Sequence, residues 1–82
     1  MKPDRWISEG GVLQRQSVAS SNVASVGYAL EGSILEVGFH SGTVYQYYGV
    51  PQSVYTAFMN APSKGRYHAR FIRDRYRFRR VA

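Results

Sequence analysis

The segment LEVGFHSGTVYQYY, residues 35–48, contains two runs of alternating side chains separated by a turn. Large apolar positions recur at every second residue: Leu35, Val37, Phe39, Tyr45 and Tyr47. An alternation with period two is typical of β-strands that bury one face. Gly42, in the turn between the runs, is free to adopt the positive φ that tight hairpins need. The segment therefore predicts an antiparallel β-hairpin.

The same alternation extends upstream of this hairpin. Val26 and Tyr28 alternate with small residues, and the following Glu31-Gly32-Ser33 is a turn sequence. Three such runs joined by short turns predict a three-stranded antiparallel meander. Its more apolar face requires a covering layer, because large apolar side chains are stable only when removed from water.

Helical patterns follow the meander. Gly49-Val50-Pro51 ends the strand pattern, and apolar residues then recur at helical spacing to about Asn60. Ser63 is a suitable N-cap for a second helix from about Lys64 to Asp74. We expect an α+β fold with both helices on one face of the sheet. The alternating stretch from Arg75 to Arg79 then forms either a fourth strand or an extended tail.

The chain of 82 residues has room for one domain. We divide it into an N-terminal arm (1–16), the domain itself (17–76) and a basic tail (77–82). We expect residues 18–74 to fold without residues 75–82. The apolar runs are too short for a membrane span, and no cysteine is present, which fits the cytoplasm.

The positive charge is concentrated near the C-terminus. The whole chain has a net charge of +6, and residues 64–80 contain eight Lys and Arg but only one acid, Asp74. Such segregation favours an anionic partner, either a nucleic acid or an acidic protein. Arginine also matches phosphate oxygens in a bidentate manner and stacks on bases.

Two sets of candidate binding residues follow from this segment and from the predicted sheet. The expected phosphate contacts are Lys64, Arg66, Arg70, Arg73, Arg77, Arg79 and Arg80. The aromatic side chains that could stack on unpaired bases are Tyr45, Tyr47, Tyr76 and Phe78. The alternative for each set is structural, with the aromatic rings in the core and the arginines on a solvated face.

The sequence contains little that points to catalysis. His40 and His68 are the only histidines, and no nucleophile-elbow or phosphate-loop motif is present. With two histidines and no cysteine, we do not expect a structural zinc site. We expect a protein that is not an enzyme and that uses no cofactor.

The ordered combination of motifs resembles the KTSC domain, a family named for its occurrence at the C-terminus of some lysyl-tRNA synthetases. The resemblance covers about Val18 to Tyr76. It rests on Ser20-Ser21-Asn22-Val23, Val26-Gly27-Tyr28, Leu35-x-Val37-x-Phe39, Tyr45-Gln46-Tyr47, Val50-Pro51, Val54-Tyr55, Ala61-x-Ser63-Lys64-Gly65-x-Tyr67, Ile72 and Tyr76. One departure is His68-Ala69, where the family usually has an aromatic residue and an Asn.

The resemblance implies an α+β fold and a stand-alone protein of bacterial or phage origin, and it suggests RNA binding. Together with the basic segment, it predicts a small non-enzymatic module that binds nucleic acid, RNA in preference to DNA, through an arginine-rich helix and tail. The alternative is an adaptor that binds an acidic protein, with Tyr76 and Phe78 as anchors. The oligomeric state stays open.

Overall fold

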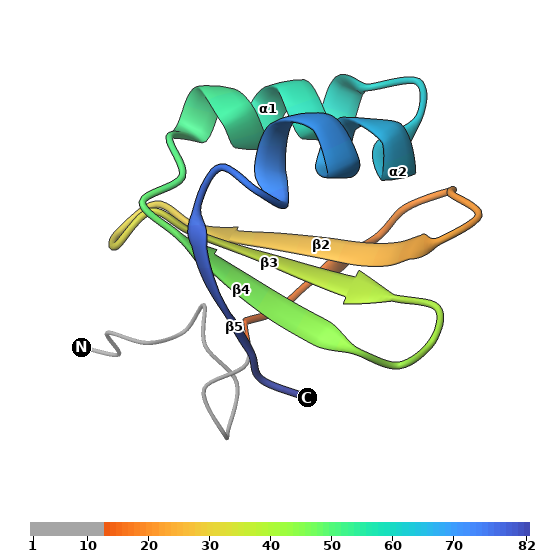
Figure 1. Cartoon of the computed structure of the whole chain (residues 1–82), viewed down its shortest axis with the longest axis horizontal. Helices are drawn as coiled ribbons and strands as arrows, with labels where there is room; N and C mark the ends of the chain where they lie inside the picture. Colours follow the sequence, from red (N-terminus) through yellow and green to blue (C-terminus); the bar gives the residue numbers. More distant parts are fainter. Residues whose placement is uncertain (1–12) are drawn as a thin grey trace.

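The computed structural model describes residues 13–82 and is built on one antiparallel sheet (Figure 1). Each strand pairs with the next along the chain, so the order is β1-β2-β3-β4-β5. The strands are β1 (Gln16–Ser17), β2 (Val23–Ala29), β3 (Ile34–Phe39), β4 (Val44–Tyr48) and β5 (Arg77–Arg80). The α+β class and the three-stranded centre of the meander are confirmed, and Gly42 has a φ of 97° in the predicted turn.

The expected strand number of three or four is corrected to five. β5 corresponds to the fourth strand that the sequence left open as the alternative to a tail, whereas β1 was not expected and begins at the end of the predicted arm. In β5, Phe78 lies opposite Tyr47 and Arg80 lies opposite Tyr45. Residues 1–12 of the expected arm lie outside the described residues, whereas Leu13 is buried.

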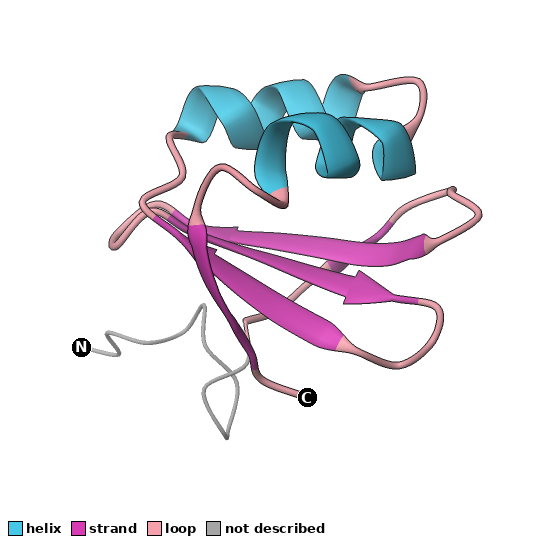
Figure 2. Ribbon diagram, in the orientation of Figure 1, coloured by secondary structure: helices cyan, strands magenta, loops and turns pink. Residues whose placement is uncertain are grey.

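The helices form a single layer on one face of the sheet (Figure 2). They are α1 (Gln52–Asn60), α2 (Lys64–Tyr67) and η1 (His68–Ile72), a π-helical turn that continues α2. The Ser63 hydroxyl accepts a hydrogen bond from the Arg66 N–H at 3.2 Å, which confirms the predicted N-cap. None of the helices within residues 13–82 has the length and apolar character needed to cross a bilayer.

The main core lies between the sheet and this helix layer. Its buried side chains are Val23, Val26, Leu35, Val37, Tyr47, Val50, Phe58 and Ile72. The helix layer meets the start of β2 closely at Gly65, where a Cβ would lie 2.8 Å from the Asn22 Oδ1 and would force the Asn22 side chain to move. Two motifs that are distant in the sequence, Ser20–Val23 and Ser63–Tyr67, are therefore in contact where the second helix packs on the start of β2.

The other face of the sheet buries a carboxylate. Glu36, in the central strand, has an exposed fraction of 0%. Its Oε1 accepts hydrogen bonds from the Leu13 N–H at 2.9 Å and from the Gln46 Nε2 at 2.7 Å, and its Oε2 pairs with Arg15. Buried charges are tolerated when they are paired and hydrogen-bonded in this way.

Two glycines allow the chain from Leu13 to Arg15 to lie directly on the sheet. A Cβ at Gly27 would be 2.5 Å from the Gln14 carbonyl oxygen, and one at Gly38 would be 2.9 Å from the Arg15 Nε. Gly27 lies opposite Glu36 in the neighbouring strand, and Gly38 lies two residues after Glu36 in β3. The two glycines therefore create the space in which the Glu36 charge is buried.

Substitution of Arg15 by Met tests this ion pair. The change should lower the free energy of unfolding by about 3 kcal/mol, because it leaves the buried Glu36 carboxylate without its cationic partner. Adding Glu36→Gln to that variant should restore part of the loss, since the remaining group is then neutral. Urea unfolding of both variants measures the effect, and an Arg15→Met protein as stable as the wild type would contradict it.

Truncation after Tyr76 tests the role of β5. Because Phe78 contacts Tyr47 and β5 pairs with β4 over four residues, its removal should lower the melting temperature. This reverses the expectation from sequence that the domain folds equally well without its tail. We expect a loss on the order of 2–4 kcal/mol, a large share of the stability of a small domain. An unchanged thermal melt would show that β5 is dispensable.

Candidate nucleic-acid interface

Three aromatic side chains form a row across neighbouring strands on the helix-side face of the sheet. Phe39 in β3, Tyr45 in β4 and Phe78 in β5 make up this sheet patch, with ring centroids 6.2 Å apart for the first pair and 5.6 Å for the second. Phe39 and Tyr45 are partly exposed, and Phe78 is 56% exposed. The patch therefore presents aromatic surface to solvent from a rigid sheet.

Beneath the patch, a buried hydrogen bond joins the sheet to the helix layer. The Tyr47 hydroxyl oxygen lies 2.7 Å from the His68 Nε2, and the His68 ring also packs edge-on against Phe39. Tyr47 is 2% exposed, so its ring is not accessible to a base, contrary to the stacking role expected from the sequence. Its function in the structure is to support the patch.

Burial sets the protonation states of this pair. It lowers the pKa of His68 to about 4, with the Arg73 charge acting in the same direction. Burial also raises the pKa of Tyr47 to about 12, assisted by Tyr45. Both side chains are consequently neutral near pH 7, and the hydrogen bond between them carries no net charge.

Arginines of β5 follow the free edge of the sheet next to the patch. By register, Arg80 lies opposite Tyr45 on the helix-side face, whereas Arg77 and Arg79 lie opposite Tyr48 and Gln46 on the other face. All three arginines are exposed. Within residues 13–82, β5 has no second strand on its outer side, so this edge presents positive charge along its length.

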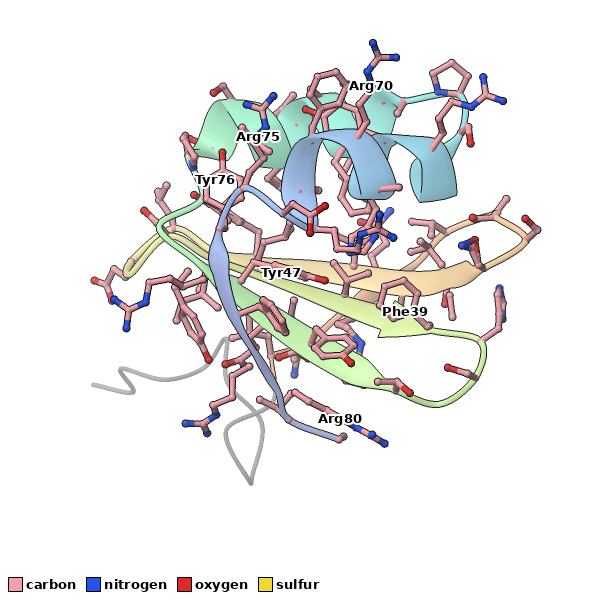
Figure 3. The ribbon with its side chains drawn as sticks, in the orientation of Figure 1. Phe39, Tyr47, Arg70, Arg75, Tyr76 and Arg80 are labelled. Atoms are coloured by element: carbon pink, nitrogen blue, oxygen red, sulfur yellow. The ribbon has the colours of Figure 1, made fainter. Side chains whose placement is uncertain are left out.

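The remaining predicted cations do not form one surface with β5. Arg73 is exposed near His68, 3.8 Å from Asp74. The Lys64 Nζ donates to the Ala61 carbonyl oxygen at 2.7 Å and so connects the two helices. Arg66 and Arg70 lie on the helix layer, and Figure 3 shows Arg70 far from Arg80. The structure thus separates strand arginines from helix arginines.

Sequence reasoning missed two members of this site. Phe39 was assigned to the core and does pack against it, but its ring is also partly exposed beside Tyr45. His68 was placed on the apolar face of the second helix and is buried there, but its contact with Phe39, by which it supports the patch from below, was not foreseen. Tyr76, a predicted stacking residue, is partly buried against the core. In the described part of the chain, no three His, Asp or Glu side chains gather as metal ligands would.

The fold and the patch define a small α+β domain with an aromatic sheet face and a basic edge. The family model of the KTSC domain matches residues 19–76. The chain belongs to the KTSC domain family. The match covers most of the sequence and the whole of the sheet except β1 and β5.

Relatives include stand-alone proteins and parts of larger ones. A crystal structure of a KTSC domain protein from Yersinia pestis is 39% identical, with a TM-score of 0.82, and the match covers 84% of this chain and 97% of that one. An uncharacterized protein of Stutzerimonas stutzeri is 39% identical over 84% of this chain and 99% of its own length. A lysine–tRNA ligase of Nostoc punctiforme is 36% identical over 76% of this chain, which spans 11% of that ligase.

The depressed pKa of His68 predicts a loss of stability in mild acid. An unfolded His binds a proton near pH 6.5, whereas His68 in the folded protein does so only near pH 4. As the pH falls through this window, the unfolded state takes up more protons, so the free energy of unfolding decreases. Between pH 7 and 5 the decrease should be about 2 kcal/mol.

A His68→Gln variant provides the comparison, because its side chain does not titrate. Urea unfolding at pH 7, 6 and 5 should show a smaller decrease for the variant than for the wild type. Parallel pH dependence in the two proteins would contradict the assignment of a buried, neutral His68.

Proposed function

We propose that this protein is a non-enzymatic RNA-binding module. The observation that carries the proposal is the position of the sheet patch beside the basic edge. Unpaired bases would stack on Phe78, Tyr45 and Phe39, and phosphates would contact the strand arginines. The proposal changes the expectation from the sequence in one respect, because the strand, and not the helix, provides most of the charge.

The chemistry of the two components supports this assignment. Base–aromatic stacking contributes about 1–3 kcal/mol per base and tolerates any sequence, because every base has a π-face. The guanidinium group of arginine binds phosphate oxygens through two parallel hydrogen bonds. A sheet that displays aromatic rings is also a recurrent platform for single-stranded RNA.

RNA is proposed in preference to DNA on two grounds. The patch is a surface for unpaired bases, which are common in the loops and bulges of RNA. The relatives also include lysine–tRNA ligases, which match over a small part of their length. We further propose that the protein acts in the cytoplasm.

Two neutral side chains beside the patch support a binding role without catalysis. A general acid or base works best with a pKa near the ambient pH. The pKa values of His68 and Tyr47 lie near 4 and 12, and the two groups are buried and bonded to each other. We therefore assign them to support of the patch.

Salt dependence tests the role of the strand arginines. For single-stranded RNA, log K should fall with log[salt] with a slope of about −0.7 per phosphate contact. The variant Arg79→Gln/Arg80→Gln should reduce the magnitude of the slope by about 1.4, whereas Arg66→Gln/Arg70→Gln should leave it nearly unchanged. Fluorescence anisotropy with RNA and DNA oligomers measures both. The absence of binding at low salt, or a larger effect of the helix pair, would contradict the proposal.

Two phenylalanines provide a matched test of stacking. Phe78 and Phe71 are both exposed, at 56% and 41%, but only Phe78 belongs to the sheet patch. Phe78→Ala should weaken RNA binding by about 1–3 kcal/mol, and Phe71→Ala should have little effect. Circular dichroism confirms that each variant is folded. Equal affinities of the two variants would remove the stacking role.

A further inference from the structure

A shallow pocket lies on the helix layer, between the end of α1 and the second helix. It has a volume of about 240 Å³ and is lined by Ala61, Pro62, Ser63, Arg66, Tyr67, Arg70 and Phe71. None of these residues belongs to the sheet patch. The four helical residues form two adjacent pairs, 66–67 and 70–71, that lie four residues apart, so they share one side of the helix.

The floor of the pocket is apolar and is fixed from below. Tyr67 stacks on the fully buried Phe58, with ring centroids 5.6 Å apart, and Phe71 packs against Tyr67 at 4.8 Å. Phe71 nevertheless remains 41% exposed. Together with Pro62 and the Tyr67 ring it forms a contiguous apolar surface, and aromatic residues are enriched at the centres of protein interfaces.

The rim of the pocket is cationic and uncompensated. Arg66 and Arg70 are both exposed, and the Arg70 guanidinium lies 5.7 Å from the centre of the Phe71 ring. The sequence has no acidic residue between Glu36 and Asp74. Within residues 13–82, neither rim arginine forms an ion pair. The rim therefore favours an anionic partner.

The polarity of the floor distinguishes between two kinds of anionic partner. The Ser63 hydroxyl already accepts a hydrogen bond from the Arg66 N–H. A nucleobase in this pocket could hydrogen-bond only to Ser63 and the rim arginines, so much of its polar edge would lie against the apolar floor, which is unfavourable. An aliphatic or aromatic side chain has no polar edge to desolvate. If Asp or Glu residues flank that side chain in a peptide, their carboxylates can pair with the rim arginines, because arginine binds carboxylates as well as phosphates.

We propose that this pocket docks an acidic peptide segment of a partner protein. One large apolar side chain of that segment occupies the pocket, and the flanking Asp or Glu side chains pair with Arg66 and Arg70. This site is independent of the RNA surface, because Figure 3 shows Arg70 on the outer side of the helix layer and Phe39 on the sheet. The domain would thus connect RNA to a protein through two separate surfaces.

Short synthetic peptides test the proposal, each with glutamates on both sides of one central residue. The central residue is Trp, Leu or Ala, and binding is followed in two-dimensional amide NMR spectra of the full chain. The Trp and Leu peptides should shift the signals of residues 61–71, and the Ala peptide should not. Arg66→Gln/Arg70→Gln should weaken binding about three- to tenfold, as expected for two exposed ion pairs.

The variants of the RNA surface serve as controls. Phe71→Ala should reduce binding of the Trp peptide, whereas Phe78→Ala and Arg79→Gln/Arg80→Gln should not. Equal binding of the Ala and Trp peptides, or no shifts at residues 61–71, would overturn the docking site. If an RNA oligomer shifted residues 61–71 and competed with the Trp peptide, the pocket would belong to RNA and the proposal would fail. Failure of RNA binding alone would leave the peptide result unchanged.

Discussion

The buried carboxylate of Glu36 is the constraint on which the arrangement of the sheet depends. A charge at the centre of a small domain must be satisfied, and here the donors come from the Leu13 backbone, Arg15 and Gln46. These donors belong to two separate segments of the chain, residues 13–15 and β4, and Glu36 itself lies in β3. Satisfying one carboxylate therefore fixes the N-terminal segment against the outer face and aligns β3 with β4.

This constraint gives the two faces of the sheet different roles. The outer face is occupied by Leu13 and Arg15, which pack where Gly27 and Gly38 leave space. The helix-side face carries the core and, beyond it, the row of aromatic rings. The Tyr47–His68 hydrogen bond then joins the helix layer to β4 directly under that row. A rigid support of this kind reduces the entropy lost when a ligand binds.

The local elements could be predicted from the sequence, because their signals are local. Period-two alternation predicted β2 to β4, and the Ser63 cap predicted the start of α2. The second helix was predicted to end near Asp74, whereas the π-turn η1 that continues it ends two residues earlier, at Ile72. The assignment of β5 could not be made, since alternating Arg and aromatic residues suit both a strand and an extended tail. The stretch becomes a strand because the edge of β4 is available for pairing, and that edge exists only once the sheet has folded.

The candidate site was predictable in composition but not in geometry. Tyr45 and Phe78 were identified as stacking residues, and the structure places their rings together. The accessible face of Phe39 was missed, because alternation reports which side of a strand a residue occupies and not how far a helix extends over it. Glu36 was likewise unrecognised, since its partners Leu13 and Arg15 lie 23 and 21 residues away in the sequence.

The central claim is that bases of RNA stack on the sheet patch. Ultraviolet cross-linking of the protein to a uridine-containing RNA, followed by mass spectrometry of the digested complex, tests this contact directly. The account predicts nucleotide adducts on Phe78, Tyr45 or Phe39. Adducts confined to Tyr67 and Phe71, or a bound RNA that cross-links to none of the sheet residues, would contradict it.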